Sequence, residues 1–342
     1  METILAQTIT DWELIVCDSF SNDGSWEFFQ QYKSDPRIRL HQVPRAGVYA
    51  GWNECLRRAT GEFVYIATSD DTMEPTCLQE LRQCLESHSE ILMATCNFRC
   101  IDERSQPLPI NCNEPTVHRL VYGDILAKAH IRNSLAEFVT TCVAGTVWGT
   151  ITAALFRRSL LDQTGLFAEN KQSIADFEWG LRACLCTDMA HVPKTLATWR
   201  MRPGQTIRTL DWARHTWLYV TMIEATLDQF RHRLPESLRT AQARRRLTYP
   251  MAVRAFQALN LYPGVFCRHP YRTVVNLCRG LHRFPRLTLR HLFRGGRWTT
   301  RETVDHRLYL AGLLAEFQLP PLLQTNTTAD NYSVSPPARA PQ

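Results

Sequence analysis

Apolar runs alternate with polar breaks along the first hundred residues of this chain, in a pattern of strands and helices. Four apolar stretches are suited to strands: one ending at Asp18, then Arg37–Val43, a third starting at Phe63, and Ile91–Asn97. Segments with the features of helices separate these stretches: Trp26–Tyr32, Arg45–Thr60 and the residues after Pro75, where Leu78, Leu81 and Leu85 recur at helical spacing. The order β-α-β-α-β-α-β predicts an α/β fold with a mostly parallel central sheet covered by helices.

Two adjacent carboxylates end the third of these stretches, which reads F-V-Y-I-A-T-S-D-D over Phe63–Asp71. Ligands in open α/β sheets bind beyond the carboxyl ends of the strands. Asp70 and Asp71 therefore lie where Mg²⁺ or Mn²⁺ and a phosphorylated substrate could be held, because such cations prefer oxygen ligands. The pair also suits an ordinary turn or helix start after a strand.

The series of motifs resembles the family-2 glycosyltransferases, whose nucleotide-sugar-binding fold is called GT-A. The resemblance covers roughly the first two-thirds of the chain and lies in the order and spacing of the motifs. They are I-L-A-Q-T at Ile4–Thr8, R-A-G-V-Y-A-G-W-N at Arg45–Asn53, T-S-D-D at Thr68–Asp71, T-G-L-F at Thr164–Phe167 and A-D-F-E-W-G-L-R at Ala175–Arg182. The resemblance implies transfer of a sugar from a nucleotide diphosphate, UDP-linked by default, to a glycan or lipid-linked acceptor. Polysaccharide or cell-surface glycan synthesis is the implied setting.

The resemblance also implies roles for single residues. Asp18 would lie at the nucleotide base, Asp70 near the ribose, and Asp71 on the metal that bridges the diphosphate, Mn²⁺ or Mg²⁺. Asp176 would be the general base that deprotonates the acceptor hydroxyl, and a single base without a covalent intermediate implies inversion at the anomeric carbon. Arg45 and Arg202 are further candidates for the donor phosphates, although a solvated surface position suits Arg45 equally.

Four departures from the family pattern keep a second interpretation open. The family's first strand should precede Ile4, so we expect a sheet that lacks one strand. Thr68 stands where many members have a first Asp, and Ser19 replaces a frequent acidic residue. Arg202 stands near a metal-reaching His of many members. The alternative is thus a non-catalytic nucleotide-sugar-binding or scaffold protein of the same fold. A nicotinamide-dependent oxidoreductase is disfavoured, because the loop after Asp18 lacks G-x-G-x-x-G.

Cysteine usage and hydropathy fit a cytoplasmic enzyme. The twelve cysteines are scattered and lack zinc-site spacing, so we expect reduced thiols, mostly in the core. No apolar run approaches the ~18 residues of a spanning helix. No secretory signal is visible in the sequence as given.

Charge is concentrated near the C-terminal end. Residues 231–310 hold 17 Arg and no Lys against three acidic residues, a formal +14, whereas the whole chain is +6. Aromatic residues interleave with these arginines, which suits peripheral contact with anionic lipid headgroups at the inner face of a membrane, although a solvated Arg-rich surface explains the pattern as well. No nucleic-acid-binding motif accompanies them. We therefore expect a GT-A domain over 1–205, a basic helical region over 206–323 and a disordered Pro-rich tail over 324–342.

Overall fold

The computed structural model describes residues 1–108, 121–146, 148–169, 174–202, 212–259, 270–293 and 304–323. The predicted disordered tail lies outside these residues. The strands are β1 (Leu14–Asp18), β2 (Ile38–Gln42), β3 (Phe63–Tyr65), β4 (Met93–Ile101), β5 (His130–Arg132), β6 (Ala154–Arg157) and β7 (Met189–Arg200). The helices of the sheet region are α1 (Glu2–Leu5), α2 (Ser25–Gln30), α3 (Val48–Arg58), α4 (Cys77–Glu86), α6 (Ser134–Ala144), α7 (Leu160–Thr164) and α8 (Ala175–Cys184). The predicted strands and helices of the first hundred residues are confirmed with shifted bounds, and the fourth strand continues beyond Asn97 to Ile101.

The five-stranded sheet is mixed rather than mostly parallel. Its order is β3-β6-β4-β7-β5, with β4 and β7 parallel and the three other pairs antiparallel. Strands β3, β4 and β7 share one direction, and β6 and β5 run against them. The prediction rested on the regular alternation of strand and helix before Asn97, whereas both reversed strands follow residue 129, where that alternation ends.

A gap divides the strands into two sheets. Strand β1 pairs in parallel with β2, and among the described residues neither strand pairs with β3. The free edges of β1 and β3 line one cavity of about 400 Å³, which also receives side chains from the segment before β1. Residues 14–17 of β1 are only partly buried, although they read Leu-Ile-Val-Cys. The gap therefore leaves an apolar strand without the full cover that a central position would give it.

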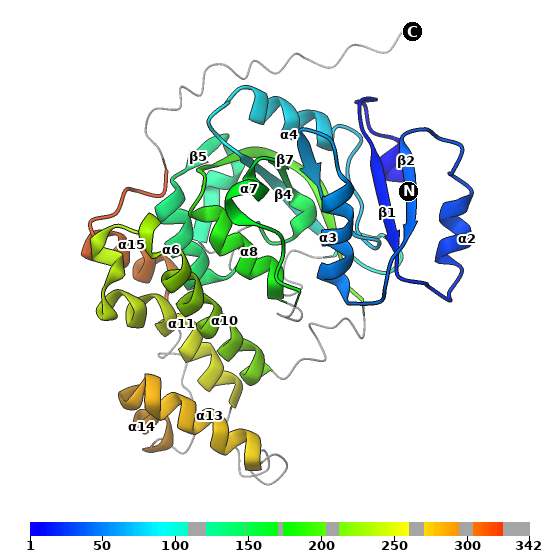
Figure 1. The fold of residues 1–342 in the computed structure, drawn as a ribbon. Helices are drawn as coiled ribbons and strands as arrows, with labels where there is room; N and C mark the ends of the chain where they lie inside the picture. The colour runs from blue at the N-terminus through cyan, green and yellow to red at the C-terminus, as the bar shows by residue number, and fades with distance from the viewer. Residues whose placement is uncertain are drawn as a thin grey trace.

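The C-terminal helices pack beneath the sheet region. They are α10 (Trp212–Gln229), α11 (Ala241–Leu259), α13 (Pro270–Arg283), α14 (Pro285–Phe293) and α15 (His306–Glu316). Figure 1 shows α10 and α11 side by side below α6 and α8, with α13 and α14 below them. Tyr219 of α10 meets Phe177 of α8 with ring centroids 4.5 Å apart. Buried side chains of both parts belong to one apolar core, which fixes the position of α8. None of the helices that the structure describes is long and apolar enough to cross a membrane.

Candidate functional site

The first site loop follows β1. Asp18 ends the strand, is buried, and accepts a hydrogen bond at Oδ2 from the Ser21 N–H at 3.0 Å. Arg45 closes this loop from the other side, since its guanidinium donates to the carbonyl oxygens of Ser19 at 3.3 Å and Phe20 at 3.2 Å. Asp18 and Arg45 thus meet at one loop, and Arg45 holds its backbone.

Phe20 was missed by the sequence reasoning. It has a positive φ of 54°, a left-handed conformation that costs a non-glycine residue roughly 1–2 kcal/mol. Its ring is 60% exposed at the tip of the Asp18 loop. A strained backbone that presents an apolar ring to solvent is typical of a binding position. An aromatic residue two positions after the Asp that ends a strand is the signal that could have identified it.

Hydrogen bonds fix one carboxylate of the pair that follows β3. Asp71 Oδ2 accepts hydrogen bonds from the hydroxyls of Thr68 at 2.7 Å and Thr152 at 3.3 Å, and its Oδ1 accepts from the Arg200 N–H at 2.8 Å. Burial raises the pKa of Asp71 and the charge of Asp70 adds to this, while the Arg200 and Thr68 hydrogen bonds oppose it. Asp70 lies partly exposed beside it.

Arg200, the last residue of β7, is a second residue that the sequence reasoning missed. Its guanidinium is buried and donates to the carbonyl oxygens of Asp70, at 2.7 Å, and Asp102, at 2.8 Å. Together with its backbone N–H, it ties the Asp70–Asp71 loop to the sheet. Arg202, which the resemblance places near the phosphates, is exposed two residues further on. The structure therefore brings Asp70, Asp71 and Arg202 to the same end of β7.

The donor set at this loop fits a cation that is completed by its substrate. Within the described part of the chain, no three His, Cys, Asp or Glu side chains gather as a metal site. Mg²⁺ and Mn²⁺ are, however, commonly held by one or two carboxylates, with phosphate oxygens and water filling the other positions. Asp71 keeps lone pairs free beyond its three hydrogen bonds, and Asp70 adds a second carboxylate.

Asp176 begins a separate network in the first turn of α8. Its Oδ1 accepts hydrogen bonds from the Tyr49 hydroxyl at 3.1 Å and from the Phe177 N–H at 2.9 Å. Burial raises the pKa of Asp176, and these two hydrogen bonds oppose the rise. The pKa of Tyr49 is raised by burial and by the charge of Asp176, so this hydroxyl stays protonated and donates. A partly buried carboxylate with a raised pKa is suited to general-base work.

Asn53 explains why two of the family-like motifs occur together. Its buried amide donates from Nδ2 to the Phe167 carbonyl at 2.8 Å and accepts at Oδ1 from the Phe167 N–H at 3.0 Å. The motif that ends in Asn53 therefore holds the turn that ends in Phe167. The Phe167 ring stacks on Tyr49, at 6.0 Å between centroids, and on Trp179, at 5.0 Å. This packing places Tyr49 beside Asp176.

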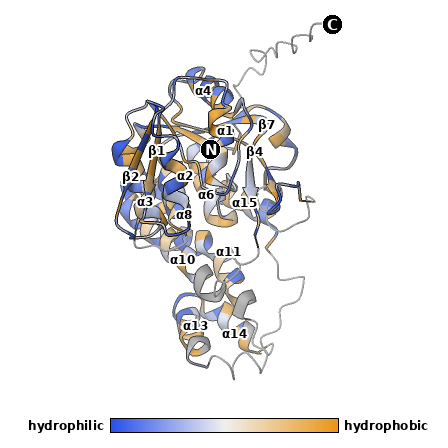
Figure 2. Ribbon diagram, turned by 90° about the vertical axis from the view of Figure 1, so that its right-hand side faces the viewer, coloured by the Kyte–Doolittle hydropathy of each residue, from blue (hydrophilic) through white to orange (hydrophobic). Residues whose placement is uncertain are grey.

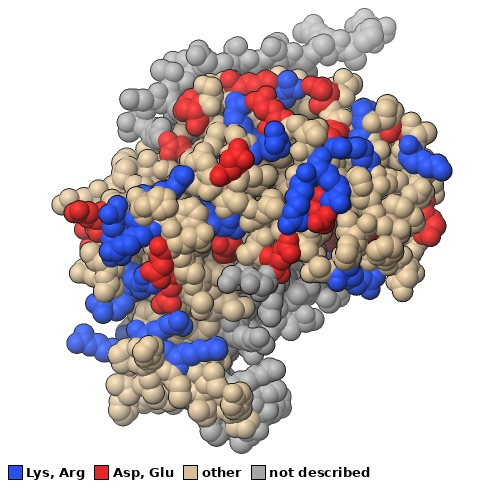
Figure 3. Space-filling view, in the orientation of Figure 1, with Lys and Arg blue, Asp and Glu red and all other residues tan. Residues whose placement is uncertain are grey.

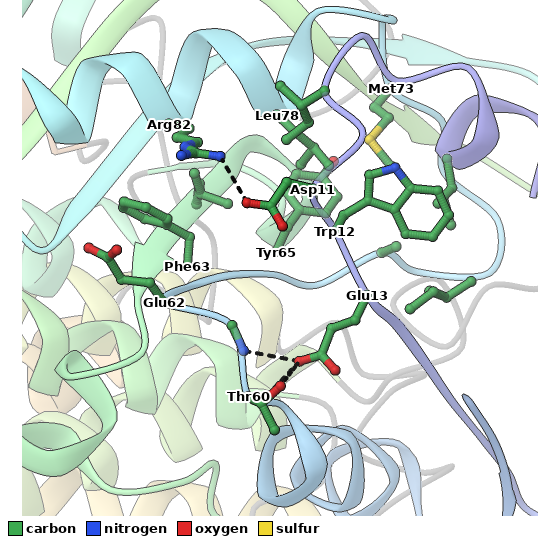
Figure 4. Close-up of a pocket in the computed structure, with 16 residues that line it drawn as sticks. Asp11, Trp12, Glu13, Thr60, Glu62, Phe63, Tyr65, Met73, Leu78 and Arg82 are labelled. Atoms are coloured by element: carbon green, nitrogen blue, oxygen red, sulfur yellow. Dashed lines mark hydrogen bonds and ion pairs between the residues drawn. The ribbon is translucent and has the colours of Figure 1, made fainter. Parts of the chain in front are cut away.

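The cavity between β1 and β3 lies apart from these polar groups. Figure 4 shows Trp12, Tyr65, Met73 and Leu78 around it, with Glu13 bonded to Thr60 at its lower rim. The indole Nε1 of Trp12 is buried and has no hydrogen-bond partner among the residues that the structure describes. Trp148 is fully buried, so the structure makes it a core residue.

Comparison with known protein families gives a match to glycosyl transferase family 2 over residues 1–165. This part of the chain belongs to that family. Chondroitin synthase of Escherichia coli is 29% identical over 136 residues, 39% of this chain and 19% of that protein. The chain spans between 19% and 38% of the length of three curated relatives that it matches.

Two solved structures show the fold. TarS of S. aureus, residues 1–349, superposes with a TM-score of 0.58 at 15% identity, covering 92% of this chain and 86% of that one. A mannosyltransferase of Pyrobaculum calidifontis, solved in complex with GDP-Man and Mn²⁺, gives a TM-score of 0.51 at 16% identity, covering 93% and 81%. The protein has the GT-A fold, as the motifs predicted.

Proposed function

We propose that the chain is an inverting glycosyltransferase that moves a hexose from a nucleotide diphosphate, UDP by default, to a glycan or lipid-linked acceptor. The observation that carries the proposal is the Asp70–Asp71 pair. It is tied to β7 by Arg200, yet it keeps carboxylate oxygens available at the carboxyl end of the sheet. The family of residues 1–165 and the GT-A fold support the same function.

Each polar group has one task in this proposal. The Asp18 loop receives the nucleotide base, with the exposed Phe20 ring stacked on it, and Asp70 faces the ribose. Asp71, with Asp70, would hold Mn²⁺ or Mg²⁺, which neutralises the negative charge that develops on the leaving diphosphate. Arg202 adds a positive charge beside the same phosphates.

Asp176 carries the proton in the transfer step. Its carboxylate takes the proton of the acceptor hydroxyl, whose oxygen forms a bond to the anomeric carbon. The bond from that carbon to the diphosphate oxygen breaks, and the electron pair leaves with the nucleoside diphosphate. Attack occurs opposite the leaving group, so the anomeric configuration is inverted. The Tyr49 hydroxyl keeps one carboxylate oxygen fixed, so that the other faces the acceptor.

A non-catalytic member of the fold is the second candidate. The divided sheet favours it, because in the described part of the chain a base pocket at the end of β1 has no neighbouring strand on the β3 side to support it. The intact hydrogen bonds of Asp71 and Asp176 favour catalysis. We further propose polysaccharide or cell-surface glycan synthesis, by analogy with relatives such as chondroitin synthase. The ten described cysteines are all free, which supports a cytoplasmic setting.

The test is isothermal titration with a panel of nucleotide diphosphates, with and without Mn²⁺, followed by a transfer assay. We expect Mn²⁺-dependent binding of one nucleotide, its loss in Asp71→Asn, and retained binding without transfer in Asp176→Asn. Asp124→Asn, an exposed carboxylate away from the site loops, is the matched control and should change neither quantity. Transfer by Asp176→Asn would reject the assigned base. Nucleotide binding without transfer by the unaltered chain would favour the non-catalytic candidate.

A further inference from the structure

The helix pair α13–α14 projects from the end of the molecule opposite the sheets. Figures 1 and 2 both show the two helices below α10 and α11, joined to the remainder through that side alone among the described elements. Only Phe284 separates them, and they pack against each other and against α11. This pair lies outside the residues assigned to donor binding and transfer.

One face of α13 is packed so closely that it fixes the orientation of the helix. A Cβ added to Gly280 would lie 2.3 Å from Phe256 Cζ and 2.6 Å from Thr288 Oγ1, so α11 and α14 both approach this glycine. Asn276 and Phe284 are buried on the same side. Arg283 forms an ion pair with Glu224 of α10 at 3.1 Å. The opposite face of α13 is therefore held toward solvent.

That solvent face carries a stripe of apolar side chains. Tyr271, Val274, Cys278 and Leu281 are exposed at intervals of three and four residues, which places them along one stripe of the helix. On α14, the exposed apolar residues are Leu289, Leu292 and Phe293. Tyr271 is 80% exposed and Phe293 87% exposed. Soluble proteins seldom expose so many large apolar side chains within two short helices.

The charges beside this stripe have a single sign. Between Glu236 and Glu302 the sequence holds 14 Arg and no Asp, Glu or Lys. Arg279 and Arg286 are exposed on the two helices. On the face that Figure 3 shows, the lower projection carries blue and tan surface and no red. Exposed apolar side chains on helices that themselves carry cations and no acidic residue are typical of a helix that lies at the surface of an anionic bilayer.

We propose that the α13–α14 pair docks this protein on an anionic lipid bilayer. The aromatic and aliphatic side chains enter the headgroup boundary, and Arg279 and Arg286 contact lipid phosphates. The exposed apolar side chains lie along one side of α13 over most of its length, so they can contact a flat bilayer surface together. A second copy of the chain fits less well, since the cations of two identical surfaces would face each other. Docking here deepens the proposed function, because it would bring a lipid-linked acceptor within reach, but binding to lipid does not depend on transfer.

The experiment is co-sedimentation of the full chain with phosphatidylcholine vesicles, with and without phosphatidylglycerol. We expect binding only to the anionic vesicles, and we expect it to weaken between about 0.1 M and about 1 M salt, where the screening length falls from about 10 to about 3 Å. Arg279→Glu/Arg286→Glu should weaken binding by at least about 25-fold, from about 5-fold for each cation lost. Tyr271→Ser/Phe293→Ser should weaken it by roughly 10-fold or more.

Matched controls separate docking from general effects. Lys33→Glu/Arg104→Glu reverses two exposed cations of the GT-A domain, and Leu308→Ser removes a side chain that is 74% exposed on α15. Both should bind like the unaltered chain. Absence of vesicle binding, equal binding to neutral vesicles, or equal loss in the controls would overturn the proposal. The proposal would also be overturned if, without lipid, the unaltered chain sediments as a dimer and Tyr271→Ser/Phe293→Ser sediments as a monomer. The apolar surface would then be an interface between two copies of the chain. If the unaltered chain binds anionic vesicles but transfers no sugar, the proposed function fails and the docking proposal stands.

Discussion

Replacing Asn53 by alanine is expected to destabilise the GT-A domain far more than the loss of one polar side chain usually does. Asn53 is 1% exposed, and its amide binds both backbone groups of Phe167, at 2.8 and 3.0 Å. Alanine leaves this buried N–H and C=O without partners. Each unsatisfied buried group costs about 1–3 kcal/mol, so we expect a loss of about 2–6 kcal/mol in the free energy of unfolding.

Asn53→Asp adds a charge to the same place and tests the burial of this position through the pH dependence of stability. The new carboxylate would face the Phe167 carbonyl and Glu169, which now accepts from Asn53 Nδ2 at 2.9 Å. Burial and like charge should raise the pKa of the introduced carboxyl group in the folded state above its unfolded value. The penalty is then full above the folded pKa and shrinks as the pH falls below it. Relative to the unaltered chain, Asn53→Asp should lose more stability at neutral pH than at a pH near that of an ordinary carboxyl pKa. Asn53→Ala should show a smaller difference of the same sign, because it removes the hydrogen bond that lowers the pKa of Glu169.

Urea unfolding followed by tryptophan fluorescence measures these losses directly, since the ring centroid of Trp52 lies 5.3 Å from that of Phe167. Asn22→Ala, at an exposed position of the Asp18 loop, is the control and should change stability by less than about 0.5 kcal/mol. A loss below about 1 kcal/mol in Asn53→Ala would refute the argument, because the two backbone groups would then have found other partners.

Three further outcomes are expected. Tyr49→Phe removes a hydrogen bond that lowers the pKa of Asp176, so the acid limb of the rate profile should move to higher pH in a transfer assay; an unmoved limb would contradict the contact. Glu137→Gln leaves the guanidinium of Arg132, fully buried and paired at 2.8 Å, without its counter-charge, and thermal unfolding should report a loss of about 3–5 kcal/mol. Phe20→Gly should relieve about 1 kcal/mol of backbone strain, measured by urea unfolding, yet weaken nucleotide binding by roughly 10-fold in titration.

Much of the fold could be predicted from the sequence because its first half is built from local signals. Leu81 and Leu85 of α4 are both fully buried, as their spacing predicts, and β1 to β4 follow apolar runs. Helices α10, α11, α13 and α15 lie within the region that the sequence predicts to be helical. The reversal of β5 and β6 could not be predicted, since pairing between β6 and β3 joins residues about ninety positions apart, and no local pattern encodes direction.

The carboxylates of the candidate site could be predicted from the sequence, whereas the residues that hydrogen-bond to them could not. Asp71 follows a strand and comes directly after a second aspartate, Asp70, so the sequence alone indicates a site. Its partners Thr152 and Arg200 lie 81 and 129 positions away, and only the folded sheet brings them together. Arg200 gave a weak signal, because an arginine at the end of an apolar stretch must find several acceptors if it is buried.

The two carboxylates assigned to donor and acceptor chemistry are held by different parts of the molecule. Asp71 is fixed by β7 and by the turn at Thr152, whereas Asp176 is fixed by Tyr49 of α3. Asn53 supports only the second network, through the Phe167 ring that stacks on Tyr49. A loosened Phe167 turn should therefore misplace Asp176 and leave the Asp71 loop intact. At temperatures where Asn53→Ala stays folded, nucleotide binding should be retained while transfer falls; equal loss of both would mean that the two networks are not independent.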